Sequence, residues 1–116
     1  MIFQAKQCKR GCQMQFKEGL CWKACYDEER DIYTAERSWR GFYQLCQIDK
    51  ETYDRLDDAL TGDDSPDALI SKGRLLFEAG GEDIESAYCI IRDEKYNELA
   101  PWSRAKDRYE RRYGKG

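Results

Sequence analysis

Residues 8–25 read CKRGCQMQFKEGLCWKAC and contain two pairs of cysteines, Cys8 with Cys12 and Cys21 with Cys25. The cysteines of each pair are four positions apart, and eight residues separate the pairs. Residues four apart lie on one face of a helix. The pattern therefore predicts two antiparallel helices whose sulfur atoms face each other. The simplest chemistry for this arrangement is two stacked disulfides, Cys8–Cys25 and Cys12–Cys21.

The rest of the sequence favours an all-α fold. It has no valine and only three threonines, so most of the usual strand-forming residues are missing. The apolar residues of 20–47 keep spacings of three, four and seven, which is typical of a long amphipathic helix. We therefore expect a helical hairpin over residues 3–47, with Trp39 and Tyr43 of its long helix in the core.

Three or four shorter helices are expected over residues 49–116, packed on the long helix. Asp49 is a candidate N-cap for the first of them. The Ser-Pro-Asp sequence at 65–67 is a good start signal for another, because serine caps a helix and proline suits its first turn. A last, highly charged helix is predicted from 102 to about 113. At 116 residues, the chain is expected to form one domain, 1–116.

The two remaining cysteines, Cys46 and Cys89, are expected to form a third disulfide that ties the hairpin to the later helices. Such a bond would contribute about 4 kcal/mol by restricting a loop of about 44 residues in the unfolded chain. Spacing alone leaves the connectivity open. Two alternatives to the disulfide-stapled hairpin also stay open: a metal site, since thiolates four apart can hold Cu(I) or Zn(II), and reduced thiols in a cytosolic protein.

The composition excludes several classes of site. The chain has no histidine, which excludes Ser-His-Asp and Cys-His catalysis and HExxH metal sites. No apolar run approaches the ~20 residues that a membrane-spanning helix needs, and no secretory signal is visible. We therefore expect no transmembrane segment, no enzyme activity, no resident metal and no cofactor.

Aromatic and basic residues give a candidate interface. Residues 102–116 carry six bases against two acids, which suggests a basic docking arm for an acidic protein or anionic lipid headgroups. Tryptophan and tyrosine are preferred anchors in interfaces. Nucleic acid is not favoured, because the whole chain has a net charge of −3 and no recognised nucleic-acid-binding motif. The alternative is that the charges are simply solvated and that later helices cover the aromatics. The candidate residues are Trp22, Tyr26, Tyr33, Trp102, Arg104, Arg108, Arg111 and Arg112.

The twin C-x3-C pattern of Cys8–Cys25 resembles the helical hairpins of the small Tim chaperones and related CHCH-like proteins of the mitochondrial intermembrane space. It also resembles, more weakly, the secreted α-hairpinin peptides of plants. The resemblance consists of the four cysteines. It implies a disulfide-stapled architecture and an oxidising compartment, and it implies no particular activity.

These observations lead to three hypotheses for function. The first is a non-catalytic structural or assembly protein, an accessory subunit or docking factor of the mitochondrial intermembrane space within a larger membrane-associated complex. The second is a secreted, disulfide-rich helical binding protein such as an effector, toxin or immune modulator. The third is an intracellular thiol protein that binds metal.

Overall fold

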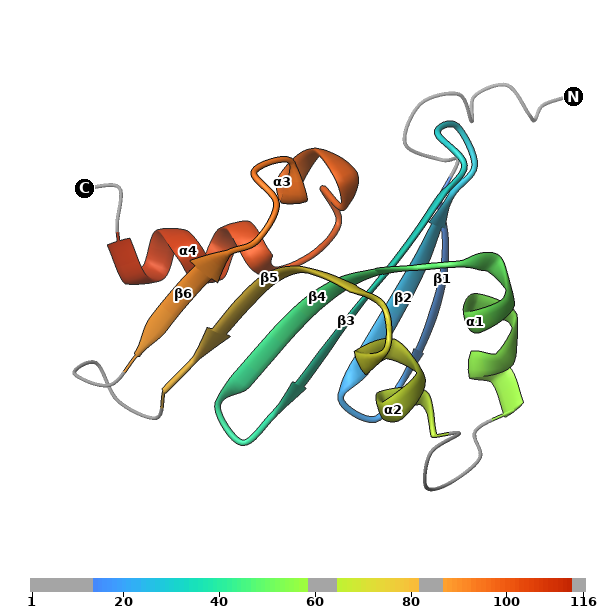
Figure 1. The fold of residues 1–116 in the computed structure, drawn as a ribbon, viewed down its shortest axis with the longest axis horizontal. Helices are drawn as coiled ribbons and strands as arrows, with labels where there is room; N and C mark the ends of the chain where they lie inside the picture. Colours follow the sequence, from blue (N-terminus) through green and yellow to red (C-terminus); the bar gives the residue numbers. More distant parts are fainter. Residues whose placement is uncertain (1–13, 59–64, 82–86, 114–116) are drawn as a thin grey trace, which may run out of the picture.

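The computed structural model describes residues 14–58, 65–81 and 87–113. Its centre is one six-stranded antiparallel sheet whose strand order follows the chain from β1 to β6 (Figure 1). The strands are β1 (Met14–Gly19), β2 (Trp22–Asp27), β3 (Ile32–Trp39), β4 (Phe42–Ile48), β5 (Arg74–Gly80) and β6 (Tyr88–Ile91).

Short helices lie in two groups. Between β4 and β5 the chain forms α1 (Lys50–Arg55), the 3-10 helix η3 (Leu56–Asp58) and α2 (Pro66–Ser71). After β6 it forms α3 (Tyr96–Leu99) and α4 (Ala105–Tyr113). The helix α2 contacts β3 and β4, whereas α4 contacts β5 and β6, so the two groups lie towards different ends of the sheet (Figure 1). The helix α4 confirms the charged C-terminal helix that the sequence predicted.

The all-α prediction is wrong, and so is the helical hairpin over residues 3–47. Residues 20–47, predicted as one long helix, form β2, β3 and β4 with their turns. Helices cover parts of both faces of the sheet, so consecutive residues such as Ala24 and Cys25 are both fully buried. A strand with one solvated face shows an alternation of apolar and polar residues, and burial of both faces weakens that alternation. The spacings of the apolar residues in 20–47 then resemble those of a helix.

Two tight turns divide this region into strands. Arg40 and Gly41 have φ angles of 44° and 83°, and positive φ at both central residues is the mark of a type I′ hairpin turn. In the turn between β2 and β3, the Asp27 carboxylate accepts hydrogen bonds from the backbone N–H groups of Glu29 (3.1 Å) and Arg30 (3.3 Å). Both turns reverse the chain within the segment 20–47 that was predicted as one long helix.

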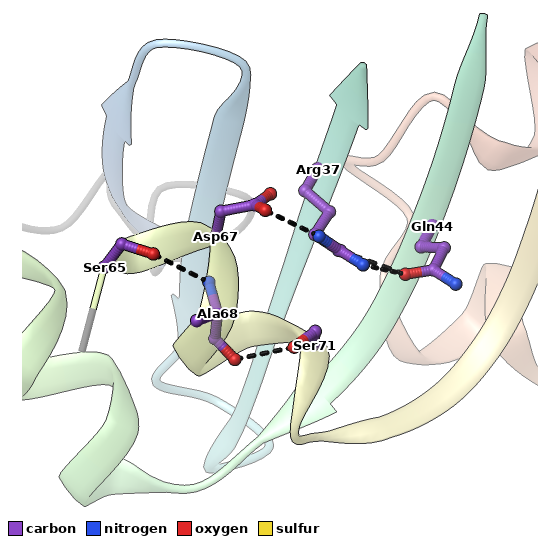
Figure 2. Close-up of polar contacts among 6 residues, drawn as sticks. All are labelled: Arg37, Gln44, Ser65, Asp67, Ala68 and Ser71. Carbon is purple, nitrogen blue, oxygen red and sulfur yellow. Dashed lines mark hydrogen bonds and ion pairs between the residues drawn. The ribbon is translucent and has the colours of Figure 1, made fainter. Parts of the chain in front are cut away.

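Two helix starts predicted from the sequence are confirmed. The Asp49 carboxylate caps α1 by accepting from the Thr52 N–H at 2.8 Å. The Ser65 hydroxyl caps α2 by accepting from the Ala68 N–H at 3.2 Å (Figure 2). The helix α2 ends at Ser71, and β5 follows it within the region that was expected to be entirely helical.

The two faces of the sheet carry separate hydrophobic clusters. Burying a side chain such as Leu45 or Phe77 completely contributes about 1.5–3 kcal/mol. The cluster under α1 and α2, termed the α1–α2 face, contains buried Ala24, Ala35, Cys46, Ile48, Tyr53, Leu56, Leu69 and Ile70. The cluster under α3 and α4, termed the α4 face, contains buried Tyr43, Leu45, Leu76, Phe77, Ala79, Tyr96, Ala100 and Ala105.

A polar contact attaches α2 to the sheet (Figure 2). The Arg37 guanidinium, on β3, forms an ion pair with Asp67 of α2 at 2.8 Å. Its Nε and Nη2 also donate to the Gln44 side-chain oxygen on β4, at 3.0 and 2.8 Å. One cation thus joins two strands and a helix on the α1–α2 face.

The predicted disulfides are not borne out by the described residues. Cys21 and Cys25 are free thiols, and their expected partners, Cys12 and Cys8, lie outside the described residues. The predicted Cys46–Cys89 bond is absent because Cys46 belongs to the α1–α2 face, whereas Cys89 packs against the α4-face cluster. The strand β5 lies between their strands, which separates the two backbones by roughly 9–10 Å, beyond the ~4.4–6.8 Å between the Cα atoms of a disulfide.

Candidate docking site at the β1–β2 hairpin

The turn that joins β1 to β2 exposes large apolar side chains. Leu20, in the turn, is 90% exposed, and Phe16 of β1 is 46% exposed. Cys21, next to Leu20, has a φ of 67° and an exposed thiol. Trp22 lies against Gly19, where an added Cβ would come within 2.4 Å of the indole nitrogen. Glycine at this position therefore lets the indole lie across β1.

A pocket of about 330 Å³ opens beside this hairpin on the α4 face. Its floor comes from the cross-strand neighbours Glu18, Lys23 and Glu36 of β1, β2 and β3. Trp102 and Arg104, from the segment between α3 and α4, form its wall. Within the described residues Lys23 and Arg104 have no ion pair, and the Lys23 ammonium lies 4.7 Å from the centroid of the Phe16 ring.

The wall is held on the sheet by hydrogen bonds. The Trp102 indole N–H donates to the Thr34 hydroxyl on β3 at 2.9 Å, and its ring meets the Phe16 ring edge-on, with centroids 5.8 Å apart. The Arg104 backbone N–H donates to a carboxylate oxygen of Glu36 at 3.1 Å. These contacts place residues 102 and 104 beside a hairpin that is about 80 positions away in the sequence.

Glu36 is the buried polar centre of this region, with only 9% of its surface exposed. The same carboxylate oxygen also accepts a hydrogen bond from the Tyr43 hydroxyl at 2.7 Å. Burial, followed by the nearby Glu36 charge, raises the pKa of Tyr43 far above its ordinary value. Tyr43 therefore stays protonated and acts as a hydrogen-bond donor throughout the physiological range.

Arg108 of α4 packs into the molecule instead of extending from it. Its guanidinium carbon lies 4.5 Å from the centroid of the Tyr43 ring, in cation–π geometry. Burial, followed by the like charge of Arg104, lowers the pKa of Arg108, and its Nε is buried without a hydrogen-bond partner in the described structure. Part of the predicted basic arm is thus used for packing.

A second pocket, of about 500 Å³, lies on the α1–α2 face of the same hairpin. Its apolar lining includes Leu20, Trp22 and Leu56. Two of its three charged residues are paired with each other, because the Lys17 ammonium forms an ion pair with Asp57 at 2.7 Å. The pocket therefore suits an apolar group.

The structure brings together three of the predicted interface residues: Trp22, Trp102 and Arg104 all line the 330 Å³ pocket. Tyr26 and Tyr33 instead stack on each other, with centroids 4.3 Å apart, and pack against the α1–α2-face cluster. Arg111 is exposed on α4, and the side chain of Arg112 lies outside the described residues.

The residues of this site that were missed in the sequence include Glu36 of the pocket floor and four residues of the hairpin, Phe16, Glu18, Leu20 and Lys23. The four hairpin residues cluster around Gly19, inside the segment 3–47 that was predicted as a helical hairpin. The signal available was this glycine between two short segments rich in aromatic residues, which also fits a hairpin.

The arrangement provides apolar surface, aromatic rings and a few charges, which are the components of a binding site. Within residues 14–58, 65–81 and 87–113, no group of three or more Cys, Asp or Glu side chains is placed to hold a metal ion. No helix in this part of the chain has the length and apolar character needed to span a bilayer. No protein-family model, curated protein or solved structure matches the chain.

Proposed function

We propose that this chain is a non-catalytic docking protein that binds a partner protein at the turn end of its β1–β2 hairpin. The observation that carries the proposal is that two pockets, on opposite faces of the sheet, share the hairpin residues Glu18, Gly19 and Trp22. Leu20, in the turn, lines the 500 Å³ pocket and is almost fully exposed. Tryptophans in pockets, with charges at the rim, are typical of the energetically important centre of an interface.

The proposal is tested by selecting ligands for the full chain from a phage-displayed library of random 12-residue peptides. Enriched peptides are synthesised, and their Kd values are measured by fluorescence anisotropy. We expect Leu20→Asp to weaken binding at least tenfold, because it places a charge where an apolar side chain should be buried.

Ile90→Asp is the matched control, since Ile90 is an exposed apolar residue (37%) on β6, away from the hairpin. It should leave binding unchanged. A library that yields no enriched peptide, or peptides whose Kd is the same for wild type and Leu20→Asp, would reject docking at this site.

The cellular compartment stays a prediction. Both the intermembrane-space and the secreted hypotheses depend on oxidised cysteines, and the resemblance that suggested them consists of spacing alone. Intact-mass measurement after alkylation of the denatured chain, with and without reductant, counts the thiols directly. Alkylation without reductant supports a reducing compartment, whereas alkylation that requires reductant supports an oxidising one.

A further inference from the structure

Among the described strands, β1 pairs only with β2, so half of its backbone hydrogen-bonding groups face away from the sheet. The Ser38 N–H donates to the Cys21 carbonyl at 3.0 Å. This bond shows which residues along β2 direct their backbone groups to β3 and which direct them to β1. Successive residues of a central strand bond to opposite neighbours, so Trp22, Ala24 and Tyr26 bond to β1. Their register partners are Gly19, Lys17 and Gln15.

The other residues of β1 must therefore point their backbone groups away from β2. These are Met14, Phe16 and Glu18, whose N–H and C=O groups are directed to the open edge. The β1–β2 register is regular from residue 14 to 19, and β1 contains no proline. It thus lacks two of the features that commonly prevent an edge strand from pairing with another chain.

The pockets lie where the side chains of an added strand would point. Side chains of successive residues alternate between the faces of a sheet. A residue opposite Lys17 or Gly19 would point towards the 500 Å³ pocket on the α1–α2 face. Its neighbour, opposite Glu18, would lie on the α4 face beside the 330 Å³ pocket.

The charges at this edge specify the added residues further. Lys17 is already neutralised by Asp57. Glu18 has no ion pair within the described residues, because its cross-strand neighbour Lys23 is turned to the Phe16 ring. The edge therefore offers the Glu18 carboxylate, which has no ion pair within the described residues, beside the apolar 500 Å³ pocket. A strand complementary to this edge would carry a cationic residue next to a large apolar residue.

We infer that the partner is an extended protein segment that adds to the sheet as a strand along β1. A Lys or Arg of this segment faces Glu18, and a large apolar residue beside it enters the 500 Å³ pocket. Main-chain hydrogen bonds would supply affinity and the alternating pockets specificity, as in other strand-addition complexes. The inference rests on the proposed docking function and specifies the chemistry of its ligand.

The test uses a synthetic 12-residue peptide from the selection described above, with Glu18→Pro and Glu18→Ala variants of the full chain. Proline removes the outward N–H of residue 18 and blocks the edge, yet it leaves the β1–β2 hydrogen bonds in place. We expect Glu18→Pro to bind at least tenfold more weakly than Glu18→Ala. Glu18→Lys should weaken binding of the original peptide, and a peptide whose basic residue is replaced by glutamate should restore the affinity for this variant.

Amide exchange of the wild-type chain, followed by NMR, gives a readout that needs no variant to fold. On addition of the peptide, the amides of Phe16 and Glu18 should become protected, whereas the amide of Lys17 should change little because it already bonds to β2. Unprotected Phe16 and Glu18 amides in the bound state would overturn strand addition.

The outcomes separate the two proposals. If Leu20→Asp abolishes binding but Glu18→Pro binds as well as Glu18→Ala, docking stands and strand addition is rejected. If Leu20→Asp has no effect, docking itself fails. If sedimentation shows a dimer without peptide that Glu18→Pro dissociates, the edge is occupied by a second copy of this chain, and the assignment of a separate partner is wrong.

Discussion

The four described cysteines occupy different environments, and these environments determine their chemistry. Cys21 is exposed in the β1–β2 turn, whereas Cys25 and Cys46 are fully buried on opposite faces of the sheet. Burial raises the pKa of Cys25 to about 12 and that of Cys46 to about 11. The Cys89 thiol lies 3.8 Å from the Arg108 carbonyl, to which it donates. Because a thiol must be both ionised and accessible to react, reactivity among these four should be concentrated at Cys21.

Labelling with a chromogenic disulfide reagent at pH 8 tests this prediction. We expect Cys21→Ser to remove a fast phase of one thiol equivalent from the native chain. Cys25→Ser should leave that phase intact, because the buried thiol reacts only when the chain opens. Loss of the fast phase in Cys25→Ser would contradict the burial of that residue.

The raised thiol pKa values also predict a loss of stability at high pH. In the unfolded chain a thiol ionises with a pKa of about 9, whereas the native pKa values of Cys46 and Cys25 are about 11 and 12. Between these pH values the unfolded state therefore binds fewer protons than the native state. The free energy of unfolding therefore falls as pH rises through this range, and below pH 9 the contribution is fully present. We expect a lower melting temperature at pH 10 than at pH 8.

The matched variants for the pH experiment are Cys25→Ala and Cys21→Ala. The melting temperature of Cys25→Ala should fall less between pH 8 and pH 10 than that of the wild type. Cys21→Ala should show the wild-type decrease, because Cys21 is exposed in the native chain and its thiol is not buried on folding. Equal decreases in all three proteins would reject the assigned cause.

At the level of single elements, the sequence was informative where a side chain acts on its own neighbouring backbone. Asp49 and Ser65 were identified as caps because each accepts from an N–H three residues ahead. The strands could not be identified in this way, since Ala24 or Leu45 is buried only once distant helices cover each face. Trp39, expected in the core, lies at a hairpin end and is 37% exposed, whereas Tyr43, four residues on, is buried as expected.

The Arg40–Gly41 turn predicts a stabilising substitution. Arginine at position 40 has a φ of 44°, a conformation that asparagine adopts more readily, and Asn-Gly is the preferred pair for a type I′ turn. We expect Arg40→Asn to raise the free energy of unfolding by about 0.4–1 kcal/mol. The measurement is urea denaturation, in which the slope of the transition should stay constant.

A β-branched residue at the same position is the control. Arg40→Val should destabilise the chain, because a branched side chain is strained at positive φ. Equal midpoints for the asparagine and valine variants would indicate that this turn does not limit stability.

At the scale of the whole molecule, residues distant in sequence meet across the sheet, and this limits what the sequence could predict. Trp22, Trp102 and Arg104 were each recognised as interface candidates from residue type and local charge. Nothing local indicates that Trp102 lies near Phe16 or that Arg104 bonds to Glu36. The 330 Å³ pocket is formed by tertiary packing. Individual residues could therefore be predicted as interface candidates, but their positions next to one another could not.

The hydrogen bond between Glu36 of β3 and Tyr43 of β4 should appear as an energetic coupling between the two residues. Glu36→Ala leaves the buried Tyr43 hydroxyl without its acceptor and the Arg104 N–H without a partner. We expect a cost of about 1–3 kcal/mol. Adding Tyr43→Phe to Glu36→Ala should cost less than the sum of the single changes, because the unsatisfied hydroxyl is removed.

Denaturant unfolding of the wild type, the two single variants and the double variant completes this cycle. A coupling free energy near zero would contradict the buried hydrogen bond. Glu18→Ala, which changes an exposed carboxylate with no ion pair within the described residues, serves as the variant expected to leave stability within about 0.5 kcal/mol of wild type.

The order of the strands has a consequence for the time course of folding. Within the described part of the chain, each strand pairs only with its predecessor and its successor, so a growing polypeptide can add every new strand to the one just completed. Such local pairing keeps contact order low and favours fast folding, and isolated hairpins form in about 1–10 μs. The longest interval between two successive strands is that between β4 and β5, because residues 49–73 must be synthesised and their ends brought together before β5 can pair. Synthesis of this protein should therefore pass through a stage in which the hairpin end proposed for docking already exists, before the α4 segment that completes its pocket has been made.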